Sequence, residues 1–227
     1  MVEYYKGQSK HLLAVDCVIF GYESGELRLL LYPRSFEPVK GKWSLMGGFI
    51  REMESCEEAA ARVLLETTGL TDIFLEQVAT FSNPHREPGV RVVSVAYYSL
   101  IRIHQQDMEL LDRHGARWWP LTNLPELIFD HGEMIRKALI SLQHKASYSL
   151  AGSELLPEKF TLLQLRKLYE AIYQRGFDAG NFRKKILSLR LLTKTSEMNF
   201  TESRKGAHYY TLDREVSDIT TERIVKF

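Results

Sequence analysis

Cysteine is scarce in this chain, with only Cys17 and Cys56 among 227 residues. Two such cysteines give no disulfide framework, so we expect reduced thiols, as is usual in the cytoplasm. Cys17 also lies in an apolar run, which predicts that it is buried. The opening MVEYYKGQSK lacks the apolar core of a signal peptide, and no segment approaches the roughly 20 apolar residues that span a bilayer. We therefore expect a cytoplasmic protein with no membrane partner.

The composition is that of a globular protein, with 44% hydrophobic and 26% charged residues. At roughly 100–200 residues per domain, the length allows one large domain or two modest ones. The formal net charge of +1 hides an asymmetry. Residues 151–227 hold 14 Lys and Arg against 10 Asp and Glu, whereas residues 1–150 are net acidic. This asymmetry is a weak indication that the C-terminal part contacts nucleic acid.

The first 150 residues alternate between strand-like and helical patterns. Ser55 and Glu58 form a capping box that begins a helix, and Gly69 ends it. A second helix is expected over 130–145. The expected strands are 11–20, 27–32, 73–81, 90–103 and 116–121, of which the first two form a hairpin.

Residues 146–159 are expected to form a linker. The pattern of helices and strands changes after it. Thr161 and Gln164 form a second capping box, and the leucines after it are spaced as in a helix. Gly176 and Phe177 mark a tight break, after which Asp178 can cap another helix. Two strands around a charged turn complete the pattern. This order predicts a winged helix, so we expect two domains, 1–150 and 151–227.

Residues 48–70, GFIREMESCEEAAARVLLETTGL, carry a spaced motif. They resemble the Nudix box, G-x5-E-x7-R-E-U-x-E-E-x-G-U, in which U is aliphatic. The matching residues are Gly48, Glu54, Arg62, Leu64, Glu66, Gly69 and Leu70. The resemblance implies a Nudix fold, an α/β/α sandwich with a mixed sheet between helices. In active members it also implies Mg²⁺-dependent hydrolysis of nucleoside diphosphate derivatives.

Two positions depart from that motif. Val63 and Thr67 stand where the Nudix box has glutamates, and their i, i+4 spacing places them on one helix face. Magnesium binds through carboxylates and phosphate oxygens, which valine lacks and threonine replaces with a neutral hydroxyl. Glu54 and Glu66 would then be vestigial, and Arg62 would pair with Glu58 or Glu66. We expect no catalytic residues, metal or cofactor; a residual Mg²⁺-dependent hydrolase is the alternative.

Basic residues gather in the expected winged helix. In this class the second helix enters the major groove, and the wing contacts the backbone. The expected DNA contacts are Thr161, Asn181, Arg183, Lys184, Lys185, Arg204, Lys205 and His208. The alternative is that these cations only form a solvated face.

A longer segment, FTLLQLRKLYEAIYQRGFDAGNFRKKILSLRLL, is similar to the C-terminal domain of Nudix-related transcriptional regulators. Phe129, Asp130 and His131 also resemble an element of that family. The resemblance covers about residues 10–212. It implies a homodimer that binds palindromic operator DNA and is released or tightened by a small ligand. A module that binds no DNA is the competing hypothesis.

The sequence leaves two classes of ligand open, a sugar and ADP-ribose. One branch of the family senses ADP-ribose and controls NAD metabolism, and others respond to sugars such as arabinose. Holding a diphosphate would require magnesium or a cluster of arginines, so the weakened metal site favours a sugar, with L-arabinose first and ADP-ribose as the alternative. The candidate ligand-binding residues are Asp16, Trp43, Asn83, Arg86, Tyr97, Asp130 and His131.

Overall fold

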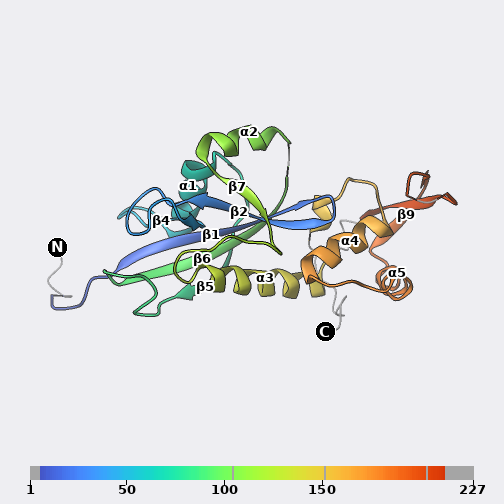
Figure 1. Cartoon of the computed structure of the whole chain (residues 1–227). Coiled ribbons are helices and arrows are strands. Elements are labelled where there is room, and N and C mark those ends of the chain that lie inside the picture. The colour runs from blue at the N-terminus through green and yellow to red at the C-terminus, as the bar shows by residue number, and fades with distance from the viewer. Residues whose placement is uncertain (1–5, 104, 151, 203, 213–227) are drawn as a thin grey trace. The chain divides into compact units, whose positions relative to one another are not determined.

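The computed structural model describes residues 6–103, 105–150, 152–202 and 204–212. The described residues form two compact units (Figure 1). Unit 1 lies within Met1–Ile19, Leu29–Ser99 and His104–Lys137, and unit 2 lies within Phe20–Arg28, Leu100–Ile103 and Ala138–Phe227.

A seven-stranded mixed sheet is the larger of the two sheets among the described residues. Its main path runs β3-β2-β1-β6-β5, while β4 pairs with β1 and β7 with β2. The strands are β1 (Leu12–Glu23), β2 (Glu26–Pro33), β3 (Trp43–Ser44), β4 (Met46–Phe49), β5 (Glu76–Phe81), β6 (Val92–Arg102) and β7 (Arg117–Pro120). β1 is buried almost throughout, as expected for a central strand covered on both faces.

Three helices accompany this sheet. They are α1 (Cys56–Thr68), α2 (Gln105–His114) and α3 (His131–Tyr148). α1 and the first part of α3 lie on opposite faces of the sheet (Figure 1), which confirms the expected layered α/β fold. The capping box of Ser55 and Glu58 is present, and Gly69 ends α1 in the left-handed conformation. The sequence did not predict α2.

Unit 2 contains the winged helix. Its elements are β8 (Phe160–Thr161), α4 (Leu162–Tyr173), α5 (Ala179–Ser188), β9 (Leu192–Asn199) and β10 (Ala207–Leu212), and its sheet has the order β8-β10-β9. The predicted cap of α4 is confirmed, and Asp178 caps α5 by accepting from the backbone N–H of Asn181 at 2.8 Å.

The expected linker at 146–159 is more ordered than its composition suggested. α3 continues to Tyr148, and a 3₁₀ turn spans Ser153–Leu155. The reason is burial, because Ala146 is 0% exposed and accepts a hydrogen bond from the hydroxyl of Tyr169 in α4. The prediction that Cys17 is buried is confirmed. No helix among the described residues is long and apolar enough to cross a membrane.

Candidate effector cleft and nucleic-acid interface

A cleft opens in unit 1 beside β4 and the C-terminal end of α1. It has polar and aromatic walls drawn from β1, β2, β4 and the loops after β2 and β5. The residues that line it are Ala14, Asp16, Tyr32, Arg34, Ser35, Phe36, Ser44, Leu45, Gly47, Gly48, Phe49, Thr67, Arg86 and Glu87.

Arg86 is the central cation of a buried cluster at this cleft. Its side chain is 3% exposed. It forms a two-pronged pair with Asp130, with Nε to Oδ2 at 2.9 Å and Nη2 to Oδ1 at 2.7 Å. The same Nη2 lies 3.7 Å from Oδ2 of Asp16. One guanidinium therefore compensates two poorly solvated carboxylates, which are costly to bury alone.

Asp16 is further held by two neutral groups. The hydroxyl of Ser94 donates to its Oδ2 at 2.6 Å, and Nε2 of His131 lies 3.6 Å from its Oδ1. The backbone N–H of Leu45 donates to Nδ1 of His131 at 3.1 Å, so Nδ1 must be unprotonated. Burial lowers the pKa of His131, and the neutral imidazole then directs its Nε2–H toward Asp16. Gly47 is required beside them, because a Cβ there would collide with Oδ1 of Asp16.

Arg34 is a second cleft arginine, and the sequence reasoning missed it. Its Nη2 donates to Glu87 at 3.0 Å, and its Nε donates to the carbonyl of Phe36 at 3.2 Å. The guanidinium lies 4.1 Å from the ring centre of Phe36 and 5.2 Å from that of Phe129. Arg34 follows the expected strand 27–32, in a segment, 33–42, that was interpreted only as a loop. An arginine flanked by aromatic residues was the signal available there.

The structure brings together four of the seven candidate ligand residues: Asp16, Arg86, Asp130 and His131. Of the seven, Asp16 and Arg86 line the cleft, whereas Asp130 and His131 contact them from outside its lining. The other three candidates lie elsewhere. Trp43 packs edge-on against Trp119, with ring centres 5.2 Å apart. Asn83 is exposed, and its side chain accepts from the backbone N–H of His85 at 2.9 Å. The hydroxyl of Tyr97 donates to Glu57 on α1 at 3.0 Å.

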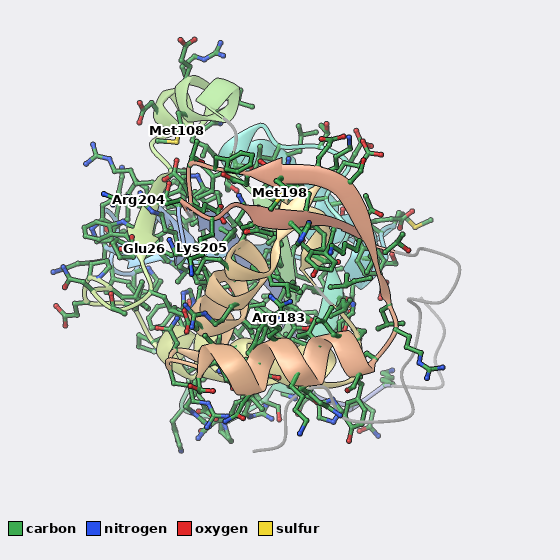
Figure 2. The ribbon with its side chains drawn as sticks, turned by 90° about the vertical axis from the view of Figure 1, so that its right-hand side faces the viewer. Glu26, Met108, Arg183, Met198, Arg204 and Lys205 are labelled. Atoms are coloured by element: carbon green, nitrogen blue, oxygen red, sulfur yellow. The ribbon has the colours of Figure 1, made fainter. Side chains whose placement is uncertain are left out.

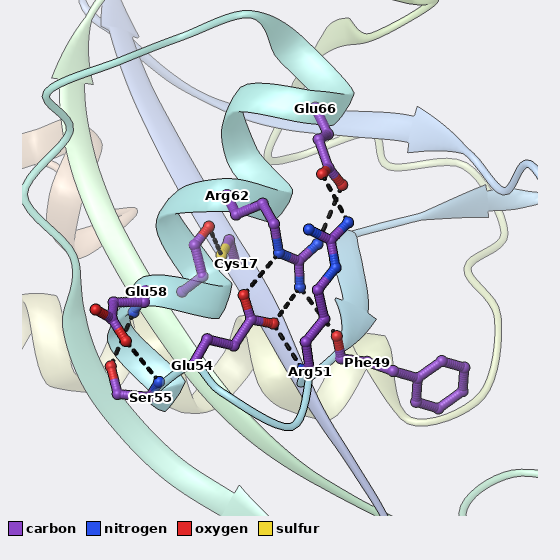
Figure 3. A network of polar contacts seen from close by, with 9 residues as sticks. Cys17, Phe49, Arg51, Glu54, Ser55, Glu58, Arg62 and Glu66 are labelled. Carbon is purple, nitrogen blue, oxygen red and sulfur yellow. Dashed lines mark hydrogen bonds and ion pairs between the residues drawn. The ribbon is translucent and has the colours of Figure 1, made fainter.

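Arg62 organises the surviving part of the Nudix box (Figure 3). It donates to both carboxylate oxygens of Glu54, to Glu66 at 3.1 Å and to the carbonyl of Phe49 at 3.0 Å. The hydrogen bond from Arg62, ahead of one from the backbone of Arg51, lowers the pKa of Glu54 to about 2. The expected pairing of Arg62 with Glu66 is confirmed, whereas the other candidate partner, Glu58, caps α1 instead. Both glutamates thus have structural partners.

The two altered box positions serve packing and helix geometry. Val63 is 3% exposed, and a Cβ on Gly48 would lie 2.7 Å from its Cγ2. Thr67 lines the cleft, but its hydroxyl donates to the carbonyl of Val63 at 2.7 Å. Within the described residues, no group of three or more His, Cys, Asp or Glu side chains is arranged to hold a metal ion. The donors present do not fit the magnesium that the Nudix fold implies.

The winged helix presents a basic face. Asn181, Arg183 and Lys184 are exposed on α5, whereas Phe182 and Ile186 on the same helix are buried. This amphipathic arrangement fixes which face of α5 is available. Figure 2 shows Arg183 on α5 and Arg204 and Lys205 on the β9–β10 hairpin, at the same end of unit 2.

The remaining expected DNA contacts are less accessible. Lys185 on α5 and His208 on β10 are half-buried. Thr161 is 0% exposed, caps α4, and donates its hydroxyl hydrogen to Glu202 at 2.6 Å. That burial leaves the Thr161 side chain no surface with which to touch DNA.

Two family models match the chain. The NUDIX domain model matches residues 10–138, and the model of the NrtR DNA-binding winged helix domain matches residues 152–212. This pair of domains defines a class of regulators that join an effector domain to a DNA-binding tail. The chain belongs to the NrtR family of Nudix transcriptional regulators.

Individual relatives show the same arrangement. The "ADPR responsive transcriptional repressor NtrR" of Acinetobacter baylyi is 31% identical over 202 residues, which cover 87% of this chain and 81% of that protein. Shewanella oneidensis NrtR complexed with a 27mer DNA is 32% identical with a TM-score of 0.75, over 93% of this chain and 98% of that one. The NUDIX domain of that regulator complexed with ADP ribose is 35% identical with a TM-score of 0.53, over 60% and 92%. These relatives give no support to the expectation of a sugar ligand.

Proposed function

We propose that this protein is a transcriptional regulator that binds operator DNA through residues 151–227 and senses ADP-ribose through residues 1–150. The observation that carries the proposal is the similarity to the Acinetobacter baylyi repressor, which spans 87% of this chain and both of its domains. The ADP-ribose complex of the Shewanella oneidensis NUDIX domain supports the assignment of the ligand to unit 1.

The cleft offers a phosphate group one guanidinium, that of Arg34, which can exchange its present partner. The sequence argument favoured a sugar because a diphosphate would need magnesium or several arginines, and it counted only Arg86 near the candidate pocket. Arg34 and Arg86 both line the cleft. Guanidinium groups recognise phosphate through paired hydrogen bonds. Arg86 is committed to Asp130, so we assign phosphate recognition to Arg34, whose present partner Glu87 a diphosphate would replace. Phe36 is 41% exposed and offers an aromatic face in the same cleft.

Sensing, rather than hydrolysis, is the proposed use of this cleft. Val63 contributes no oxygen, and Arg62 already engages Glu54 and Glu66. A Nudix hydrolase needs magnesium to activate water and to neutralise the pyrophosphate. Residual Mg²⁺-dependent hydrolysis is the competing function, and the ligand experiment tests it directly.

The DNA-binding half of the proposal rests on the exposed basic side chains of the winged helix. We assign base and phosphate contacts on α5 to Asn181, Arg183 and Lys184, and phosphate contacts on the wing to Arg204 and Lys205. Lys185 and His208 remain secondary candidates. We also propose that the protein is cytoplasmic and binds a palindromic operator as a homodimer.

Thermal unfolding with added ligand tests the effector. A ligand that binds only the folded protein at 100 times its Kd raises stability by about 2.7 kcal/mol. We expect ADP-ribose, but not L-arabinose, to raise Tm, and Arg34→Gln to reduce the shift. The matched control is Arg117→Gln, which removes an exposed arginine of β7. A shift with L-arabinose alone would reject the ligand, and breakdown of ADP-ribose in excess Mg²⁺ would reject the sensing-only role.

Operator binding is tested with a duplex selected from a randomised pool. We expect the affinity to fall as salt rises, and ADP-ribose to change it. Arg183→Ala and Lys184→Ala should weaken binding while the ADP-ribose shift in Tm survives, and Arg117→Ala should leave binding unchanged. Full affinity in both α5 variants would refute the assignment of α5 as the recognition helix.

A further inference from the structure

The turn of the β9–β10 wing exposes two large apolar side chains. Phe200 is 66% exposed and Met198 is 36% exposed. Exposed single apolar residues are common, but here two of them belong to one turn. Figure 2 shows Met198 on β9, at the end of unit 2 that also presents α5.

The turn holds this ring outward by specific hydrogen bonds. Asn199 is buried, and its side-chain oxygen accepts from the backbone N–H of Thr201 at 2.8 Å, from the Thr201 hydroxyl at 2.6 Å and from the N–H of Glu202 at 3.2 Å. These bonds close the turn immediately around Phe200. The exposure of the ring therefore follows from an ordered backbone.

A glycine across the turn completes this support. Gly206 has a φ of +77°, and a Cβ there would lie 2.6 Å from Cε of Met198 and 3.0 Å from the ring of Phe200. The two apolar side chains thus lie against the backbone at Gly206 and form one knob. A knob fixed in this way loses little conformational entropy when it is buried by a partner.

The charge around the knob is positive. Arg204 and Lys205 are both exposed next to it. Of the two nearby acidic groups, Glu197 pairs with Lys159, and Glu202 directs its carboxylate to the buried hydroxyl of Thr161. An apolar knob flanked by cations matches the minor groove, which is bordered by phosphates and into which architectural proteins insert apolar wedges.

We propose that Phe200, supported by Met198, is a wedge that enters the minor groove of the operator beside the α5 contact and partly unstacks one base step. Arg204 and Lys205 hold the flanking phosphates. The proposal rests on the proposed DNA-binding function. It predicts specificity for easily unstacked pyrimidine–purine steps at a position that no hydrogen bond reads.

Salt dependence separates the wedge from the cations. Phe200→Ala should weaken operator binding roughly tenfold to a hundredfold, the range for loss of one base–aromatic stack, with an unchanged slope of log K against log salt. Lys205→Ala should instead lower the slope by about 0.9, because it releases one phosphate contact. Phe200→Leu should retain part of the affinity because it keeps an apolar wedge. Circular dichroism of each variant verifies the fold.

A fluorescent base reports the unstacking itself. Duplexes carrying 2-aminopurine at successive operator steps should brighten at one step with wild-type protein, and this signal should vanish with Phe200→Ala. Equal affinity and equal fluorescence for wild type and Phe200→Ala would overturn the wedge while the proposed function stands. Loss of dimerisation in Phe200→Ala, with the fluorescence unchanged, would also overturn it by assigning the knob to a protein contact. No duplex binding by wild type would overturn both proposals.

Discussion

Replacing Arg86 with methionine should destabilise unit 1 more than any surface change. The guanidinium is 3% exposed, forms two hydrogen bonds with Asp130 and lies 3.7 Å from Asp16. Methionine keeps much of the apolar volume but leaves two poorly solvated carboxylates without a cation. Removing one partner of a buried ion pair costs about 3–5 kcal/mol. At about 2–4 °C for each kcal/mol, Tm should fall by roughly 6–20 °C.

A double-mutant cycle isolates the electrostatic part of that loss. Asp130→Asn removes one of the carboxylates that Arg86 compensates, so Arg86→Met should cost less in that background than in wild type. We expect the two substitutions to be non-additive by about 2 kcal/mol, within the range for residues in one buried network. The remaining cost in the double variant reflects Asp16, which keeps its hydrogen bond from Ser94.

Tryptophan fluorescence during urea unfolding measures the free energy of unfolding of unit 1 in each variant. The three tryptophans, Trp43, Trp118 and Trp119, all belong to unit 1. Arg136→Met is the matched control, because Arg136 pairs with Glu133 at 3.9 Å in an exposed setting and should cost no more than about 0.5 kcal/mol. A loss below about 1 kcal/mol for Arg86→Met, or strict additivity with Asp130→Asn, would refute the reasoning.

Three further predictions concern single contacts. Burial lowers the pKa of His131, so the unfolded chain binds more protons below the ordinary histidine pKa of about 6.5, and stability is lost as pH falls from there toward the folded pKa. His131→Asn, which can still accept from the Leu45 N–H, should flatten this dependence in urea unfolding; an equally steep profile would contradict the assignment. Gly48→Ala should cost about 1–3 kcal/mol in the same assay because of Val63, and Val63→Ala should relieve it; additive losses would argue against the contact. Thr161→Ala should cost about 1 kcal/mol in thermal circular dichroism by removing the α4 cap, whereas Thr161→Ser should be near neutral; equal losses would exclude capping as the cause.

Local chemistry made much of this fold predictable. Ser55, Thr161 and Asp178 each cap a helix through a hydrogen bond to a residue three positions ahead, so the signal lies within one turn. β8 escaped notice because it has only two residues, and it exists through pairing with Tyr209 and Tyr210, which are distant in sequence. α2 has a polar composition with few apolar positions, so its periodicity was weak evidence.

The cleft was harder to predict than the fold. Residue type, together with the family resemblance at Asp130 and His131, singled out Asp16, Arg86, Asp130 and His131. The strand β1, the loop after β5 and the start of α3 bring these residues together. Arg34 was missed because it follows β2 in a segment interpreted as a connection. That omission decided the choice of ligand, since Arg86 is committed to Asp130 and Arg34 is the cleft arginine that we assign to phosphate.

The two glutamates that match the box do not by themselves indicate hydrolysis, because both hold Arg62. Glu54 and Glu66 hold Arg62, and Arg62 ties α1 to the carbonyl of Phe49 at the end of β4 (Figure 3). Losing either glutamate would weaken the contact between the helix and the strand that lines the cleft. Val63 and Thr67 lie outside this network, and they are the two positions at which the box has changed. A binding cleft without magnesium would keep the glutamates that hold Arg62 and would tolerate change at Val63 and Thr67. This pattern supports a sensing role for this Nudix domain.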